Sequence, residues 1–127
     1  MEKNKLTNSE WEVYECLWEE APLTLAQLRK RYVQRTGLAV STAETTVLRM
    51  EKKGLLLVEQ GERAKLFYPL FAREQAVRRE TRSFLNRVYG GSPLSLMSAM
   101  VDAGEFSDKE IDQLYAMLRK EKEKRDG

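Results

Sequence analysis

The sequence predicts a mainly α-helical protein that contains a β-hairpin. The first observation is a Ser/Thr-x-x-Glu/Gln pattern, typical of a helix N-terminus, which occurs at Thr7, Thr24, Ser41 and Ser107. The second is a change of pattern between residues 55 and 68, where two short apolar runs flank a glycine turn. The chain has 127 residues, of which 42% are hydrophobic and 33% charged. This composition suits one globular domain with a small addition.

The first two helices are defined by their caps and by the helical spacing of their apolar residues. In the first helix the hydroxyl of Thr7 is expected to cap the N-terminus, and Pro22 is expected to end the helix. Its apolar face is formed by Trp11, Tyr14, Leu17 and Trp18. The second helix begins at Thr24 and ends before Gly37. Its apolar face is formed by Leu25, Leu28 and Tyr32.

A third helix and a hairpin complete the N-terminal part. The helix is expected to begin with a capping box at Ser41 and Glu44, to bury Ala43, Val47 and Met50, and to end before Gly54. The hairpin is expected from the runs at 55–58 (LLLV) and 65–68 (KLFY), joined by a turn at 60–62 (QGE). Three helices followed by a hairpin is the order of a winged helix-turn-helix, in which a wing of two or three strands follows the third helix. The domains are therefore placed at residues 1–70 and 71–127.

The C-terminal part returns to helical spacing and is expected to form a three-helix dimerisation segment. One helix is expected from Arg73 to Tyr89, a short apolar helix follows the break at 90–93 (GGSP), and a last helix begins at Ser107 and frays at its end. So short a segment buries little core alone, so its large apolar residues favour pairing with a second copy. The predicted dimerisation residues are Val77, Phe84, Leu85, Val88, Tyr89, Leu94, Met97, Met100, Val101, Ile111, Leu114, Tyr115 and Leu118. The alternative is that these helices fold back onto the N-terminal domain.

The third helix also offers a surface that suits double-stranded DNA. At about 100° per residue, the side opposite its apolar face is formed by Ser41, Thr45, Leu48 and Lys52, with Arg49 beside them. Hydroxyl and cationic side chains bond base edges and phosphates, and Leu48 suits the methyl group of thymine. The predicted DNA-binding residues of this helix are Ser41, Thr42, Thr45, Leu48, Arg49, Lys52 and Lys53. The alternative is an ordinary amphipathic helix with a solvated polar side.

The distribution of charge favours the same part of the chain. The formal net charge is only +2, but residues 24–68 contain nine Lys or Arg against four Glu. Basic charge concentrated in a few elements is typical of a phosphate-binding surface. On the wing, Arg63 and Lys65 are alternate residues, so both are expected to face a phosphate backbone or a minor groove. The alternative is that these cations protect an edge strand from aggregation.

The composition argues against an enzyme and against a metal protein. The chain has no histidine, a single cysteine (Cys16) and no glycine-rich phosphate loop, so nucleophilic triads and common metal sites cannot be assembled. No cofactor is expected. Cys16 is expected to be a small hydrophobic residue at the edge of the first helix. Because no apolar run is long enough to cross a membrane and no signal peptide is recognisable, a cytoplasmic location is expected.

Several segments resemble the penicillinase and methicillin-resistance repressor family, to which BlaI and MecI belong and to which CopY is related. They are EWEV at 10–13, LW at 17–18, TTVLR at 45–49, KKGL at 52–55, FYP at 67–69, FLNRVY at 84–89 and GS at 91–92. The resemblance implies a homodimeric winged-helix transcription repressor that binds double-stranded DNA at a partly palindromic operator. It also implies a membrane sensor protease as a candidate partner.

Two departures from the family pattern leave the inducing signal open. The β-lactam-responsive members are inactivated by proteolysis at an Asn-Phe bond, where this chain has Ala99 and Met100. The copper-responsive relatives bind metal through C-terminal cysteines, and this chain has none there. A second function remains open as well, because the near-neutral net charge also permits a winged-helix module that binds protein rather than DNA.

Overall fold

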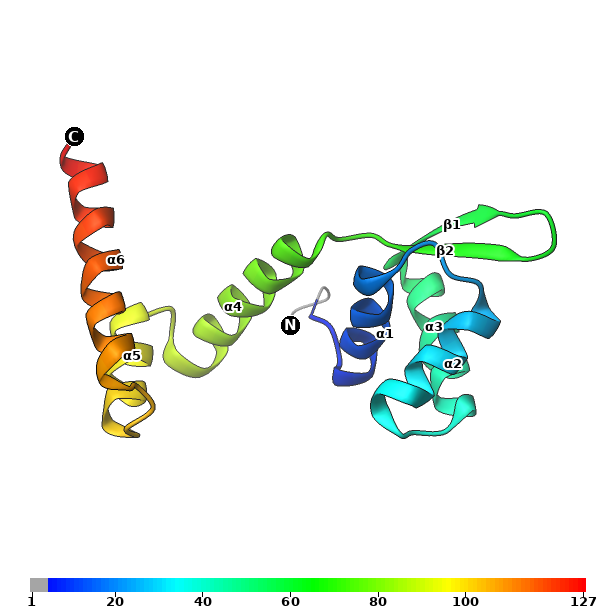
Figure 1. The fold of residues 1–127 in the computed structure, drawn as a ribbon, viewed down its shortest axis with the longest axis horizontal. Coiled ribbons are helices and arrows are strands. Elements are labelled where there is room, and N and C mark those ends of the chain that lie inside the picture. The colour runs from blue at the N-terminus through cyan, green and yellow to red at the C-terminus, as the bar shows by residue number, and fades with distance from the viewer. Residues whose placement is uncertain (1–4) are drawn as a thin grey trace. The chain divides into compact units, whose positions relative to one another are not determined.

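The computed structural model describes residues 5–127, which form a mainly helical chain with an antiparallel hairpin (Figure 1). The elements in chain order are α1 (Asn8–Glu19), α2 (Leu25–Thr36), α3 (Val40–Lys53), β1 (Leu56–Gln60), β2 (Lys65–Pro69), α4 (Arg73–Tyr89), α5 (Pro93–Asp102) and α6 (Asp108–Asp126). This order confirms the predicted fold class. The chain divides into two compact units, the first ending at Ser83 and the second comprising Phe84–Gly127.

Three of the four predicted capping boxes are present. Thr7, Thr24 and Ser107 each accept a hydrogen bond from the backbone of the third helical residue, whose side chain bonds the cap in return. The fourth prediction is wrong, because α3 begins at Val40, its N-cap is Ala39, and no side chain caps it.

The start of α3 differs from the prediction for a local reason. Gly37 ends α2 in the left-handed conformation, with a φ of 73°. The next helix, α3, begins soon afterwards at Val40. Ser41 therefore already lies in the first turn of α3, where its hydroxyl cannot act as the N-cap. The predicted partner in that box, Glu44, forms an ion pair with Arg29 of α2 instead.

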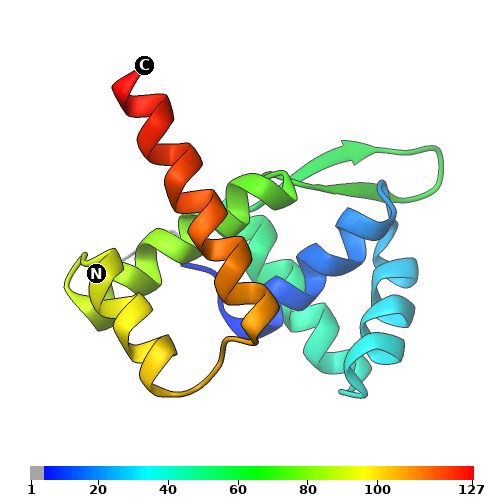
Figure 2. The same ribbon diagram turned by 60° about the vertical axis from the view of Figure 1, so that its left-hand side comes forward.

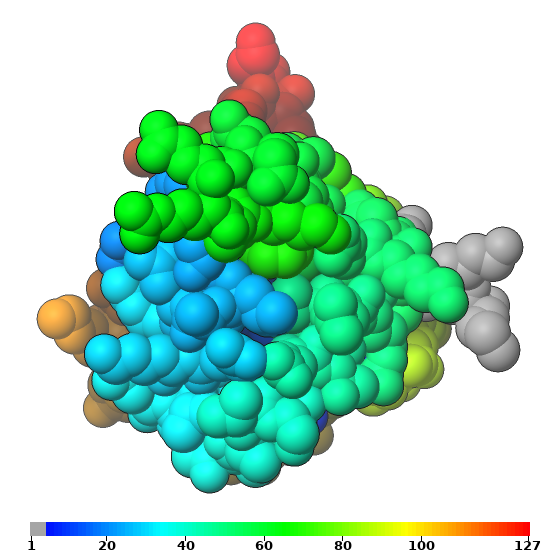
Figure 3. Space-filling view, turned by 90° about the vertical axis from the view of Figure 1, so that its right-hand side faces the viewer, coloured from blue at the N-terminus to red at the C-terminus, as the bar shows by residue number. Residues whose placement is uncertain are grey.

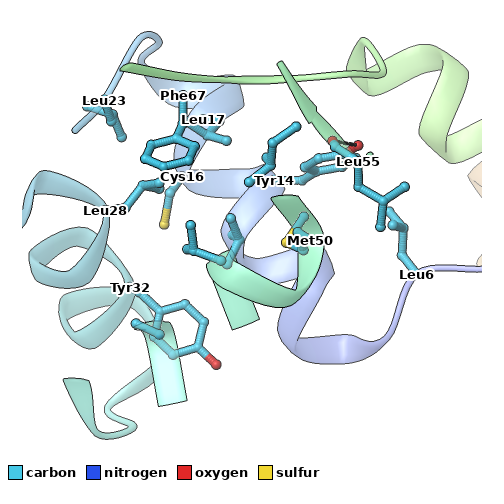
Figure 4. Close-up of a cluster of buried hydrophobic side chains, with 14 residues drawn as sticks. Leu6, Tyr14, Cys16, Leu17, Leu23, Leu28, Tyr32, Met50, Leu55 and Phe67 are labelled. Carbon is cyan, nitrogen blue, oxygen red and sulfur yellow. Dashed lines mark hydrogen bonds between the residues drawn. The ribbon is translucent and has the colours of Figure 1, made fainter. Parts of the chain in front are cut away.

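The core of the first unit lies between the three helices and the hairpin (Figure 4). Ala43, Val47 and Met50 are completely buried, which confirms the predicted inner face of α3. The hydroxyl of Tyr14 donates a hydrogen bond of 2.5 Å to the carbonyl oxygen of Leu55. The largest buried side chain of α1 therefore also satisfies a backbone acceptor where the hairpin begins.

Cys16 lies inside this core and not at the edge of α1, so its predicted position is wrong. Its side chain is 2% exposed. The reason is that α1 packs against both α2 and α3, so its buried surface is wider than a single apolar stripe. Burial raises the pKa of the Cys16 thiol, which keeps the thiol protonated and unreactive.

The hairpin forms the predicted wing. β1 and β2 pair antiparallel, with Leu57 opposite Tyr68 and Val58 opposite Phe67. Leu23, which lies between α1 and α2, forms an isolated antiparallel β-bridge with Phe67 of β2, because its N–H and carbonyl group both bond the backbone of Phe67 at 3.2 and 2.8 Å. The base of the hairpin is thus fixed to the helices, and its turn extends beyond them (Figures 1 and 2).

The first half of α4 belongs to the winged unit. Trp18 Nε1 donates a hydrogen bond of 2.9 Å to the carbonyl oxygen of Phe71, and the N–H of Leu6 donates one of 3.2 Å to Glu80 Oε1. Ala76 is buried, with 1% exposure. The winged unit therefore continues to Ser83, beyond the end of the wing at which the sequence places the domain boundary.

The second unit contains the end of α4 together with α5 and α6. Ser92 caps α5 by accepting a hydrogen bond of 3.1 Å from the N–H of Ser95. α6 remains helical to Asp126, so the predicted fraying of the Lys/Glu-rich end is wrong. Ala99 and Met100 lie inside α5.

No side chain of residues 84–127 is buried. In the described part of the chain, no helix is both long and apolar enough to cross a membrane.

Candidate nucleic-acid interface

The outward side of α3 carries the side chains that the helical spacing predicts. Ser41, Thr45 and Lys52 are exposed, and Leu48 is 57% exposed. They lie opposite Ala43, Val47 and Met50, which hold the helix to the core. Arg49 is exposed beside them, whereas Thr42 is only partly exposed. The predicted surface therefore exists as one continuous side of the helix.

A buried hydroxyl cluster fixes the position of α3, and sequence reasoning missed it. Thr46 is 4% exposed, and its Oγ1 lies 2.6 Å from Ser9 Oγ of α1 and donates a hydrogen bond of 2.7 Å to the carbonyl oxygen of Thr42. Ser9 Oγ in turn lies 2.8 Å from the hydroxyl of Tyr32 on α2. These hydroxyl groups join all three helices. The signal in the sequence is that Thr46 lies three residues after Ala43 and four before Met50, which places it on the apolar face of α3.

Most of the basic residues between 24 and 68 are paired with carboxylates of the same chain. The paired cations and their partners are Arg29 with Glu44, Arg31 with Glu20, Arg35 with Glu12, Glu15 and Glu19, Lys53 with Glu10, and Lys65 with Glu51. Within that stretch, which the structure describes completely, the cations that form no ion pair are Lys30, Arg49, Lys52 and Arg63. Three of these four, Arg49, Lys52 and Arg63, were predicted to bind DNA. Because the other cations are paired, a count of Lys and Arg overstates the basic charge that is free to contact phosphate.

Lys53, which was predicted to contact phosphate, has a partner inside the protein. Its Nζ lies 2.8 Å from Oε2 of Glu10, a residue that is 1% exposed. Burial alone would raise the pKa of Glu10, but the hydrogen bonds from Lys53 and from the N–H of Thr7 outweigh burial and lower it. The ammonium group of Lys53, in the last turn of α3, thus neutralises the charge of the buried Glu10 carboxylate.

The two predicted wing cations differ in their surroundings. Arg63 lies in the turn between β1 and β2, so the alternation of strand residues does not apply to it, and that reasoning was wrong. Lys65 lies on β2, and its Nζ is 3.0 Å from Glu51 Oε2 of α3. The turn requires glycine at Gly61, because a Cβ there would lie 2.6 Å from the carbonyl oxygen of Ala64. Within this turn the side chain of Arg63 is exposed to solvent. The side chain of Lys65, in contrast, joins the wing to α3.

The elements that carry these residues share one face of the winged unit. In Figure 3 the green hairpin, the cyan α2 and the blue-green α3 lie next to one another on the face toward the viewer. A surface composed of a helix and a projecting hairpin matches the way winged helix-turn-helix proteins contact a groove and the neighbouring backbone.

The acidic side chains of α1 form ion pairs rather than a metal-binding cluster. Within residues 5–127, no group of three or more His, Cys, Asp or Glu side chains could hold a metal ion. The carboxylates of α1 instead surround Arg35, whose guanidinium lies 2.9 Å from Glu12, 3.4 Å from Glu15 and 3.2 Å from Glu19. This acidic side of α1 holds α2 in place.

Comparison with known proteins identifies the class of protein. A model of the penicillinase repressor family matches residues 6–120. The chain belongs to the penicillinase repressor family. It is therefore a DNA-binding transcriptional repressor, and its family is not one of enzymes.

The repressor matches its relatives over nearly its whole length. The penicillinase repressor of Bacillus licheniformis is 25% identical over 121 residues, covering 95% of this chain and 94% of that protein. The methicillin resistance regulatory protein MecI of Staphylococcus aureus (strain N315) is 23% identical over 116 residues, covering 91% and 94%. The solution structure of the DNA binding domain of the repressor BlaI matches 57% of this chain and 88% of that domain, with 21% identity and a TM-score of 0.50. This structural likeness shows the winged-helix fold.

The residues predicted to mediate dimerisation are partly or largely exposed in the repressor. Leu94 is 79% exposed, Tyr115 66% and Val101 and Leu118 60% each. None of the predicted dimerisation residues is buried, and all of them lie in the part of the chain that the structure describes. Met117, which the sequence analysis did not name, is also exposed, at 61%, and lies about one turn beyond Leu114 on α6.

Proposed function

We propose that the chain represses transcription as a homodimer that binds a partly palindromic operator, with one α3 in the major groove of each half-site. The observation that carries this proposal is the outward side of α3, where Ser41, Thr45 and Leu48 are exposed next to the unpaired cations Arg49 and Lys52. A side formed by hydroxyl groups and free cations can bond both base edges and phosphates.

The proposed contacts divide into two kinds. Ser41 and Thr45 lie in the first half of α3, whose N-terminus has no side-chain cap, so the first-turn N–H groups and the helix dipole favour a phosphate there. Arg49 reaches a guanine edge or a phosphate, and Lys52 contacts the backbone. Arg63 in the wing turn contacts the backbone beyond the groove. Lys53 and Lys65 contribute mainly by holding α3 and the wing in place.

The homodimer is supported by the second unit. Residues 84–127 bury no side chain, although they include large apolar residues on all three helices. Helices whose apolar side chains are at most partly buried gain little of the apolar burial that offsets the loss of chain entropy. A second copy would cover these side chains, and a two-fold dimer would match a palindromic operator.

A salt series on the full-length protein tests the DNA assignment. The probe is the promoter duplex upstream of the chain's own gene, and binding is measured by fluorescence anisotropy. If Arg49, Lys52 and Arg63 of both protomers each neutralise one phosphate, the logarithm of the affinity falls against the logarithm of the salt concentration with a slope of about −5. A flat dependence, or no binding at low salt, would contradict DNA binding and favour a protein partner.

Sedimentation tests the dimer. Full-length protein is expected to be dimeric at micromolar concentration, whereas a chain that ends at Ser83, the end of the winged unit, is expected to be monomeric. A full-length monomer at that concentration would contradict the role assigned to the C-terminal helices.

A further inference from the structure

Exposed aliphatic side chains occur along α3 and just before it. Leu48 is 57% exposed, Val40 is 48% exposed, and Leu38, which precedes the helix, is 51% exposed. Val40 opens α3, and Leu48 lies about two turns further along, on the outward side of the helix. Thr45, also exposed, adds a methyl group on the same side. A solvated helix would carry polar residues at these positions.

The same segment lacks free groups for reading the other bases. Residues 38–53 contain no Asn or Gln, the side chains that bond adenine through two hydrogen bonds. Glu44 and Glu51 could accept a hydrogen bond from cytosine, but they are paired with Arg29 and Lys65. The unpaired cations Arg49 and Lys52 remain for a contact with guanine. The remaining distinctive group in the major groove is the C5-methyl group of thymine, which apolar side chains contact.

We infer that α3 recognises thymine by its methyl group, with Leu48 and Val40 as the residues that determine this specificity. The inference rests on the proposed function, because it names the base that the proposed interface reads. Each half-site of the operator therefore carries thymine where α3 enters the major groove. Hydroxyl groups of Ser41 and Thr45 bond the neighbouring edges or phosphates.

The test compares thymine with uracil, which lacks only the C5-methyl group. A preferred duplex is first selected with the full-length protein from a randomised library, and each thymine is then replaced by uracil in turn. For at least one thymine in each half-site, affinity is expected to fall about fourfold, the effect of withdrawing one buried methyl group. The same replacement is expected to leave the affinity of Leu48→Ala or Val40→Ala unchanged.

Two further variants separate methyl recognition from general damage. Leu48→Met keeps an apolar side chain and is expected to retain the preference for thymine. Leu70→Ala removes an exposed leucine outside α3 and is expected to discriminate like the unchanged protein. Equal affinity for thymine and uracil duplexes at every position, with salt-dependent binding retained, would overturn the inference and leave the proposed function standing. Equal losses on both duplexes for Leu48→Ala would also overturn it. Failure to select any duplex would contradict the proposed function itself.

Discussion

The Nζ of Lys53 lies 2.8 Å from the Oε2 of Glu10, and this contact joins the end of α3 to the start of α1. Glu10 also bonds the N–H of Thr7, which begins α1. A single buried carboxylate therefore caps one helix and fixes the C-terminal end of the helix that is proposed to read DNA.

Replacement of Glu10 by glutamine is expected to lower the free energy of unfolding by about 1–3 kcal/mol at pH 7. The range is below that of a fully buried ion pair because the Lys53 side chain is 44% exposed. Because the pKa of Glu10 is lowered on folding, its ionised form stabilises the protein above about pH 4.5, and this stabilisation is lost as the pH falls through the lowered pKa. Urea unfolding of Glu10→Gln and the unchanged protein between pH 7 and 3 measures the difference, which should shrink below pH 4.5.

Glu20→Gln provides a matched control for the loss of one carboxylate. Glu20 is paired with Arg31 at the surface, and its side chain is 58% exposed. Its replacement is expected to change stability little at any of these pH values. A difference between Glu10→Gln and the unchanged protein that stays constant from pH 7 to 3 would contradict the role given to the ionised carboxylate.

Thr46→Val is expected to destabilise the protein by about 1–2 kcal/mol, because it removes the hydroxyl that bonds Ser9 and leaves the hydroxyl cluster between the helices incomplete. Thr45→Val makes the same chemical change one residue earlier, where the side chain is exposed. Thermal unfolding should therefore separate the two variants, with Thr45→Val close to the unchanged protein. Equal melting temperatures for the two variants would show that the cluster does not hold α3.

Arg49→Ala and Arg63→Ala are expected to weaken DNA binding in different ways. If Arg49 bonds a base, its loss should cost about 1–3 kcal/mol on the operator and relax specificity. Arg63→Ala should weaken operator and random duplexes alike and make the salt slope shallower by about one unit for each protomer. Competition anisotropy on both duplexes measures these effects. Arg31→Ala, which removes a cation paired with Glu20, should change binding less than either.

Limited proteolysis should begin in the connection between α5 and α6 and not at the bond between Ala99 and Met100. Those two residues lie inside α5, and their carbonyl groups accept hydrogen bonds from the N–H groups of Ala103 and Glu105. Residues 103–105 are exposed outside the helices, where proteases cut preferentially. Brief digestion with thermolysin and mass spectrometry identify the first cut. A first cut at 99–100 would contradict this assignment.

The parts of the fold that local sequence determines were predictable. The boxes at Thr7, Thr24 and Ser107 predicted three helix starts, because the groups that cap a helix are close in sequence. Ser41 and Glu44 carry the same pattern, yet no cap forms there, because Glu44 pairs with Arg29 and the turn after Gly37 lets α3 begin earlier. A tertiary contact prevailed over a local pattern.

The candidate site was predictable to a similar extent. Helical spacing alone placed Thr45, Leu48 and Lys52 on one exposed side of α3. Spacing could not show that Lys53 is paired with Glu10, because these residues are far apart in the sequence. The same holds for Lys65 and Glu51, and for the hydroxyl cluster around Thr46. Which basic residues remain free for a phosphate depends on these long-range contacts.

A chemical nuclease tethered at position 45 tests the central claim most directly. Because Cys16 is buried and its thiol has a raised pKa, Thr45→Cys supplies the accessible thiol for attachment. The nuclease is expected to cut the operator at the bases of the major groove near the middle of each half-site. The same nuclease attached through Thr81→Cys on α4 is expected to leave those bases intact. Cutting from position 81 with none from position 45 would contradict the assignment of α3 as the element that reads DNA.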